Sequence, residues 1–154
     1  MRSHLANDLL AEALASGLAL GGPWDEVARE VTRGRSRFDF RLARGDQVCW
    51  VAAKSVTLVE GRAALFPDAV TARGRRHKDE LAAIAATGAR AAAVFVVQRA
   101  DADSFSPHWD NDPAFAQALE RAAEAGVTVL AYGCDVSLTE IRIVRPLPMA
   151  LGRP

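Results

Sequence analysis

The feature that most constrains the fold is the segment Gln47–Leu58, QVCWVAAKSVTL, which is apolar on both of its sides. Alternate residues of an extended strand share a side. One side carries Val48, Trp50, Ala52 and Lys54, and the other carries Cys49, Val51, Ala53 and Ser55. A strand that is apolar on both sides belongs in the middle of a sheet that is covered on both faces. Lys54 lies within this strand, where lysine is rarely buried without a partner.

The segments around this strand have the periods and turn residues of further strands and of helices. Two short segments precede it, Glu26–Thr32 and Ser36–Ala43, and glycine-containing turns connect the three as hairpins. Sequence periods and helix caps predict helices at residues 5–18, 71–87 and 112–125, and strands at 91–98, 127–132 and 141–144. The order is a helix, a three-strand meander, and then helix, strand, helix and strand. It predicts an α/β fold with a mixed sheet and helices on both faces.

Length and composition fit one globular domain. The chain has 154 residues, half of them hydrophobic, and we expect a domain over residues 1–145 and a flexible tail at 146–154. No apolar run reaches the length of a membrane span, and the first residues lack a signal sequence, so we expect a cytoplasmic protein. Cys49 and Cys134 lie far apart in strand segments, which predicts two reduced core residues.

The formal net charge is zero, but the charges are unevenly distributed along the chain. Residues 29–78 contain twelve Lys and Arg against five Asp and Glu, an excess of +7, and the remainder carries −7. This asymmetry predicts a basic side that faces an anionic partner. Two solvated faces of opposite charge would give the same count, so the count alone leaves both interpretations open.

The strand that precedes the central one is expected to be half-buried. Its apolar side consists of Phe38, Phe40 and Leu42, and its charged side of Arg37, Asp39 and Arg41. A symmetric register around Gly45–Asp46 places Asp39 opposite Ala52, with Lys54 as its neighbour on the same face. Two carboxylates and a lysine in this arrangement, D…(D/E)-x-K, hold a divalent cation for phosphodiester cleavage. Here Ala52 stands where the second carboxylate would be.

Six motifs of this chain follow one another with a consistent spacing. They are SRFDF (36–40), VAAKSVTLVEG (51–61), ALFPDAVTARGRRH (64–77), FVVQRADADSF (95–105), DPAF (112–115) and GVTVLAY (126–132). Together they resemble the SfsA family, the sugar fermentation stimulation proteins, over about Ser3 to Ile143. The resemblance implies a restriction-endonuclease-like domain of the PD-(D/E)XK superfamily, which in the family follows a small OB-type barrel. It also implies DNA binding that is linked to the regulation of sugar metabolism.

Two features depart from the family pattern. The central strand of the family typically reads V-E-V-K, whereas this chain reads Val51-Ala52-Ala53-Lys54, so the glutamate is absent. The sequence also begins where the second domain of the family begins, so it does not contain the barrel. The first departure predicts an impaired metal site, and the second is expected to lower the affinity for DNA.

These patterns provide the candidate site residues. Asp39 and Lys54 are the candidate catalytic residues, and Asp39 with Glu12 of the first helix is the candidate ligand set for Mg²⁺ or Mn²⁺. The candidate nucleic-acid contacts are Arg35, Arg37, Arg73, Arg75, Arg76, Lys78 and Gln98. Further arginines around the hairpins are Arg33, Arg41 and Arg44, and some of this set are expected to pair with local carboxylates. The three tryptophans are isolated in the sequence, which favours packing over base stacking.

Three hypotheses of function follow. The first is a DNA-binding domain without strong sequence preference on a nuclease-like scaffold. The second is a metal-dependent nuclease that is impaired by Ala52. The third is an interaction module without a nucleic-acid partner. The expected partner is DNA rather than a membrane, and the sequence does not distinguish a monomer from a dimer.

Overall fold

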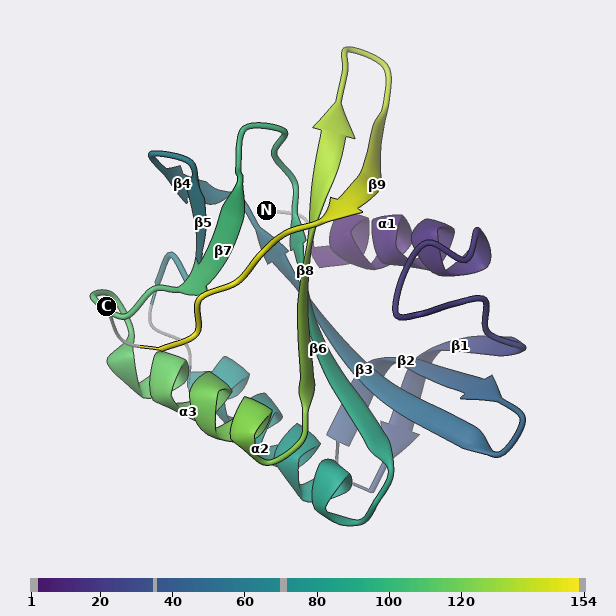
Figure 1. Ribbon diagram of the computed structural model, residues 1–154. Coiled ribbons are helices and arrows are strands. Elements are labelled where there is room, and N and C mark those ends of the chain that lie inside the picture. Colours follow the sequence, from purple (N-terminus) through teal and green to yellow (C-terminus); the bar gives the residue numbers. More distant parts are fainter. Residues whose placement is uncertain (1–2, 35, 70–71, 153–154) are drawn as a thin grey trace.

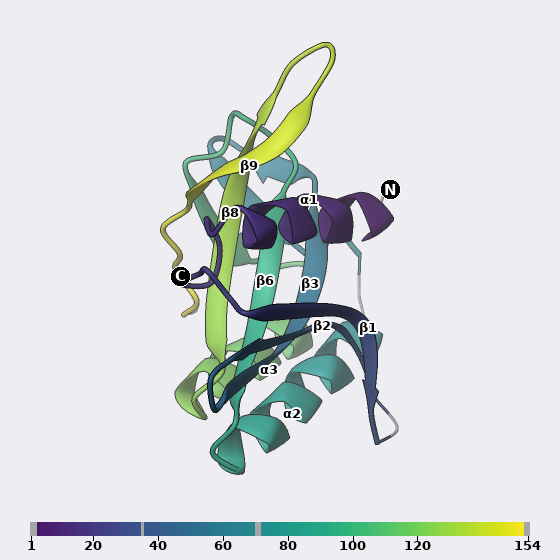
Figure 2. The ribbon, with the colours of Figure 1, turned by 90° about the vertical axis from the view of Figure 1, so that its right-hand side faces the viewer.

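The computed structural model describes residues 3–34, 36–69 and 72–152, with side chains from Leu5 onward and, in the second helix, from Asp79 onward. A twisted six-stranded sheet forms its centre, with one helix on one face and two helices on the other (Figures 1 and 2). The strand order is β1 (Glu26–Arg33), β2 (Ser36–Arg44), β3 (Gln47–Val56), β6 (Arg90–Val97), β8 (Thr128–Val136) and β9 (Ile141–Pro146). The helices are α1 (Ser3–Ala15), α2 (Ala72–Ala86) and α3 (Pro113–Glu124).

The pairing of the strands makes the sheet mixed, as the sequence predicts. β1, β2 and β3 form an antiparallel meander with short turns. β3, β6 and β8 are parallel, and the connections between them carry α2 and α3 across the same face. β9 returns antiparallel to β8 in a hairpin that projects beyond the rest of the sheet (Figure 1). The α/β class, the mixed sheet and the helices on both faces are therefore confirmed.

Two apolar clusters hold the layers together, one on each face of β3. Under α1, Leu10 and Leu14 share a cluster with Val51, and all three are fully buried. Under α2 and α3, Phe115 shares a cluster with Ala52. Burial of one large apolar side chain stabilises a domain by about 1.5–3 kcal/mol. The central position of β3, which the sequence predicts from its two apolar sides, is confirmed.

The sequence does not predict a second, three-stranded sheet. This sheet consists of β4 (Leu58–Glu60), β5 (Ala63–Phe66) and β7 (Ser104–Pro107), and it lies beside the carboxyl end of β3 (Figure 1). The predicted strand 47–58 is wrong at its end, because β3 stops at Val56 and the chain enters the second sheet at Leu58. Strands of three or four residues contain too few residues to show a period of two.

Local signals place the ends of the helices close to the predicted positions. α3 begins after Asp112, whose side chain accepts a hydrogen bond from the Phe115 N–H at 3.0 Å, and Pro113 occupies its first position. It ends before Gly126, which has a φ of 107°. α1 ends three residues earlier than predicted, since Gly17 adopts a left-handed φ of 79°.

The segment 147–152 differs from the flexible tail that the sequence predicts. Leu147 is only 6% exposed. The Phe105 N–H donates to the Pro148 carbonyl at 3.0 Å, and the Ala150 N–H donates to the Phe105 carbonyl at 3.1 Å. These bonds hold the segment along β7. The prolines exclude regular structure here, but they leave the neighbouring backbone groups able to bond.

Two further expectations concern the cysteines and the membrane. Cys49 and Cys134 are buried and free, as their strand positions predict. Burial raises the pKa of each thiol from its ordinary value of 9.0 to about 11. Within residues 3–34, 36–69 and 72–152, no helix is long and apolar enough to cross a membrane.

Candidate functional site

Asp39 lies where β2 separates from β3. The two strands pair from Arg44–Gln47 to Phe40–Val51, in the register that the sequence predicts, and their ladder ends there. In this register the Ala53 N–H points toward β2. It donates to the Asp39 Oδ2 at 2.7 Å. The carboxylate therefore takes the place of a main-chain acceptor at the position where the strands part.

The pairing of β1 with β2 is irregular at the same level. The two strands pair on both sides of it, but the ladder contains no pair between Glu30 and Asp39, and Glu30 has a left-handed φ of 55°. Phe40 then enters the cluster under α1, whereas Phe38 enters the cluster on the opposite face. The prediction that Phe38, Phe40 and Leu42 share one side is wrong for Phe38. The irregularity at Asp39 interrupts the alternation.

The other oxygen of Asp39 binds α1. The Asn7 Nδ2 donates to the Asp39 Oδ1 at 2.9 Å, in a partly buried contact. A hydrogen bond to a charged group contributes about 1.5–3 kcal/mol to stability. The carboxylate thus joins α1, β2 and β3 at one point, and both of its oxygens serve the fold.

Lys54 lies further along β3, in register with Phe95 of β6, and its side chain is half-buried. The alternation along β3 assigns Lys54 to the side of Ala52 and Phe95, which α2 and α3 cover. The side-chain partner of Asp39 comes from α1, which covers the opposite face. The contact between Asp39 and Lys54 therefore stays a prediction, and the alternation along β3 does not favour it.

The surroundings of Asp39 do not fit a bound Mg²⁺ or Mn²⁺. Ala52, at the position of the missing carboxylate, is 0% exposed in an apolar cluster. Glu12 is exposed. It follows Asn7 by five residues of α1, which places it about 140° around the helix and about 7.5 Å along the helix axis from Asn7. Among the described side chains, no three His, Cys, Asp or Glu gather in a group that could hold a metal ion. A hard cation requires several oxygen ligands that point at it, and the described side chains around Asp39 do not supply such a set.

Some arginines of β1 and β2 are neutralised within the fold. Arg29 pairs with Asp8 of α1 at 2.8 Å, and Arg37 pairs with Glu30 of β1 at 2.6 Å. All of these side chains are largely exposed, and exposed pairs of this kind contribute about 0–1 kcal/mol. Arg37, a candidate DNA contact, therefore already has a carboxylate partner in the free protein.

Arg33 of β1 and Arg41 of β2 contact an aromatic ring instead. Their guanidinium carbons lie 5.2 and 5.8 Å from the centroid of the Trp50 ring, which is within the range of about 6 Å for cation–π contacts. In the part of the chain that the structure describes, neither arginine forms an ion pair with a carboxylate. Their charges are therefore not neutralised by the described side chains.

The remaining candidate contacts either have partners or lie outside the description. The Gln98 Nε2 donates to the Ser55 Oγ at 2.7 Å. The Arg44 Nη1 donates to the carbonyls of Gly21 and Pro23. Arg35 lies outside the described residues. The backbone of α2 begins at Ala72, but the described side chains do not include Arg73, Arg75, Arg76 and Lys78.

Sequence reasoning misses Asn7 and the contacts of Trp50. Asn7 binds a residue 32 positions away, and no local pattern in α1 signals this contact. Trp50 does carry a signal, because the register that places Asp39 opposite Ala52 also places Arg41 opposite Trp50. The register could therefore have identified Arg41, but it could not have identified Asn7.

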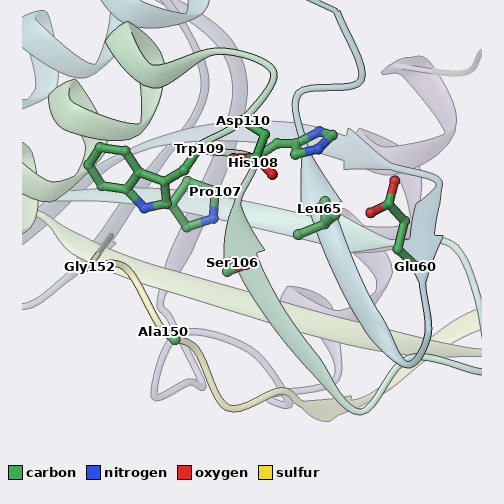
Figure 3. Close-up of a pocket in the computed structure, with 9 residues that line it drawn as sticks. All are labelled: Glu60, Leu65, Ser106, Pro107, His108, Trp109, Asp110, Ala150 and Gly152. Atoms are coloured by element: carbon green, nitrogen blue, oxygen red, sulfur yellow. The ribbon is translucent and has the colours of Figure 1, made fainter. Parts of the chain in front are cut away.

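A cavity of about 460 Å³ opens beside the second sheet (Figure 3). Glu60, His108 and Asp110 contribute its charged and titratable side chains. The His108 Nδ1 lies 3.2 Å from the Pro67 carbonyl oxygen, which fixes the orientation of the ring. None of the candidate site residues with a described side chain lines this cavity. The cavity is therefore separate from Asp39 and from the arginines of β1 and β2.

The comparisons with known proteins agree on one family. The family model described as "Sugar fermentation stimulation protein RE domain" matches residues 4–140. Sugar fermentation stimulation protein homologs from Desulforamulus reducens and Moorella thermoacetica are 43% and 46% identical over 97% of this chain, and the matches cover 63% and 65% of their own lengths. The solved structure of Pyrococcus furiosus SfsA in complex with Ca²⁺ superimposes with a TM-score of 0.90 and 31% identity, over 96% of this chain and 65% of that one. The chain thus spans just under two-thirds of the length of these relatives.

Proposed function

Because the chain belongs to the sugar fermentation stimulation (SfsA) family, we propose that it binds duplex DNA without strong sequence preference and contributes to the regulation of sugar metabolism. The observation that carries the DNA proposal is the excess of seven positive charges in residues 29–78. Within this segment, β1, β2 and β3 are neighbours in the sheet. Cations that neutralise phosphates release counterions from DNA, and this release drives binding that is independent of sequence.

The tryptophans support a backbone contact over a base contact. Trp24, Trp50 and Trp109 are each 8% exposed. Stacking on a base requires an accessible aromatic face, and these rings are packed in the protein. The described surface therefore favours phosphate contacts, which carry no sequence information.

The salt dependence of binding tests the proposal. Fluorescence anisotropy would follow the binding of two labelled duplexes of unrelated sequence at salt concentrations from about 50 to 200 mM. We expect similar affinities for both duplexes, with log Kobs falling linearly with log[salt]. Binding that does not respond to salt, or no binding at the lowest salt, contradicts the proposal. For the metabolic link, growth of a strain that lacks the gene on single sugars is the corresponding measurement.

A second candidate function is metal-dependent phosphodiester cleavage. Asp39 and Lys54 occupy the motif positions, and the Pyrococcus furiosus relative was solved in complex with Ca²⁺. Against this function stand the buried Ala52 and the lack, among the described side chains, of three His, Cys, Asp or Glu that could hold a metal ion. We expect calorimetric titration with Ca²⁺, Mg²⁺ or Mn²⁺ to show no saturable binding, and plasmid DNA to remain intact. Plasmid cleavage that requires a metal and disappears in Asp39→Ala would favour the nuclease over the binding protein.

A further inference from the structure

Arg33 and Arg41, which together form the arginine pair, come from neighbouring strands and converge on one indole ring. Their guanidinium carbons lie 5.2 and 5.8 Å from the Trp50 centroid. The ring is 8% exposed and packs against Phe38, with the two ring centroids 5.7 Å apart. A ring fixed in the core in this way orients the guanidinium groups of the exposed Arg33 and the half-buried Arg41.

The arginine pair differs from its neighbours on the same strands in how its charge is balanced. Arg29 of β1 and Arg37 of β2 each have a carboxylate partner, at 2.8 and 2.6 Å. For Arg33 and Arg41, the described side chains supply a ring face but no carboxylate. Each strand of the hairpin thus carries one arginine with a carboxylate partner, Arg29 or Arg37, and one of the arginine pair; Arg44, at the end of β2, instead donates to the Gly21 and Pro23 carbonyls.

Physical chemistry indicates what the unneutralised pair can bind. Two like charges that contact the same ring repel each other, and a cation–π contact attracts each charge without neutralising it. Phosphate oxyanions bound by the two guanidinium groups would neutralise both charges. The planar fork of N–H donors on arginine matches the geometry of a phosphate group. The guanidinium groups also cover the ring, so a base cannot stack on it.

We propose that the arginine pair is a phosphate-binding site for the DNA backbone, and that Trp50 is the positioning residue that orients it. The site rests on the DNA binding proposed above and assigns that binding to one place on the hairpin of β1 and β2. It identifies Arg33 and Arg41 as contacts in place of Arg37, whose charge Glu30 neutralises. Since every DNA sequence presents the same phosphates, the pair contributes affinity without sequence preference.

The test compares two double variants of the full chain, Arg33→Ala/Arg41→Ala and Arg29→Ala/Arg37→Ala. Each removes one arginine from β1 and one from β2, so both change the net charge by the same amount. Because the two variants have the same net charge, long-range attraction to DNA is reduced equally in both. A difference in affinity between them then reports the direct contact of the arginine pair with DNA. Binding of a labelled duplex is measured by anisotropy across the same salt series as for the parent protein.

We expect loss of the arginine pair to weaken binding about 10-fold at low salt and to reduce the slope of log Kobs against log[salt] by about 2, one for each phosphate contact. The Arg29→Ala/Arg37→Ala variant is expected to keep the parent slope. Equal losses in both variants overturn the site, because net charge alone would then explain them. If the parent protein shows no salt-dependent binding, the proposed function and the site are both wrong. If the parent binds and Arg33→Ala/Arg41→Ala binds with the same affinity and slope, only the site is wrong.

A second set of variants separates charge from folding. Urea unfolding shows whether Arg33→Ala/Arg41→Ala is folded, and Arg33→Gln/Arg41→Gln replaces it if it is not. Arg33→Lys/Arg41→Lys keeps both charges, and we expect it to retain the parent slope, because lysine also contacts phosphates as a point charge. If the lysine variant reduces the slope of log Kobs against log[salt] as much as the uncharged alanine or glutamine variant does, the arginine pair does not contact phosphates.

Discussion

Asp39 and the arginine pair lie on the same hairpin, yet the fold uses their charges in opposite ways. Both oxygens of Asp39 accept hydrogen bonds from the protein itself, from Asn7 and from the Ala53 N–H. The described carboxylates leave the arginine pair without an ion pair. Asp39, which belongs to the sequence motif, therefore stabilises the fold, whereas the charges of Arg33 and Arg41, which lie outside the motif, are not neutralised by the described carboxylates.

This difference separates two kinds of experimental effect. A change at Asp39 removes contacts between three elements, so it should appear first in the free energy of unfolding. A change at the arginine pair removes one exposed and one half-buried side chain, neither of which has a described carboxylate partner, so it should appear first in DNA binding. Four substitutions test this separation through the free energy of unfolding, which is measured in the absence of DNA.

The largest effect is expected for Ala52→Glu, which restores the residue type of the family motif. Ala52 is 0% exposed among Phe38, Trp50 and Phe95. A buried carboxylate without a compensating partner destabilises a protein by about 3–5 kcal/mol, and Lys54, half-buried on the same side of β3, can offset part of this cost. We expect a loss of about 3 kcal/mol in urea unfolding, and no plasmid cleavage in Mg²⁺ or Mn²⁺.

The control for this substitution is Ala52→Gln, which adds nearly the same volume without a charge. The glutamine variant measures the effect of overpacking, and the difference between the two variants measures the effect of the charge. A glutamate variant that is as stable as the parent and cuts plasmid DNA would show that Asp39 can serve a metal. The contrast between an Asp39 that serves only the fold and an arginine pair that can bind a ligand would then be wrong.

The next largest effect is expected for Asp39→Ala. This change removes the acceptor of the Ala53 N–H at 2.7 Å and of the Asn7 amide at 2.9 Å. An unsatisfied buried donor costs about 1–3 kcal/mol, so we expect a loss of about 2–3 kcal/mol in urea unfolding. Asp39→Asn keeps one acceptor for the Ala53 N–H and should lose less than half as much. Equal losses in both variants would show that charge, and not the hydrogen-bond geometry, holds the junction.

The register around Asp39 could be predicted from the sequence, but the role of Asp39 could not. The two-residue turn at Gly45–Asp46 fixes the pairing of β2 with β3, and simple symmetry around it places Asp39 at the correct level. The change of side between Phe38 and Phe40 depends on the irregularity opposite Glu30 and on a contact with Asn7 of α1. Tertiary contacts of this kind leave no local period in the sequence.

A similar limit explains the small sheet and the C-terminal segment. β3 and β6 are long enough to show their apolar character; β6 lies within one residue of its predicted bounds, and β3 begins where predicted and ends two residues early. β4 has three residues, and its pairing with β5 follows from a turn that the sequence shows only as Gly61. The order of the segment 147–152 comes from backbone bonds to β7, which a count of prolines cannot reveal.

A smaller effect is expected for Asn7→Ala. This change removes one of the two hydrogen bonds of Asp39 but leaves the carboxylate partly accessible to water. We expect a loss of about 1.5 kcal/mol, the lower end of the range for a hydrogen bond to a charged group. A double-mutant cycle with Asp39→Ala should give a coupling energy of about the same size, because the two residues are in direct contact. Strictly additive losses would show that the Asn7 contact does not hold α1 to the junction.

The smallest effect is expected for the arginine pair itself. Arg33→Ala/Arg41→Ala removes two cation–π contacts of about 0.5–1 kcal/mol each, but it also removes the repulsion between two guanidinium groups near one ring. These terms oppose each other, so we expect a net loss below about 1 kcal/mol.

The repulsion is stronger at low ionic strength, so the loss of stability in Arg33→Ala/Arg41→Ala should shrink as the salt concentration falls. Urea unfolding at two salt concentrations measures this trend, and Arg29→Ala/Arg37→Ala should show the reverse, since its ion pairs are strongest at low salt. A loss above about 2 kcal/mol for the arginine pair would place it among the groups that hold the fold, and the contrast with Asp39 would disappear.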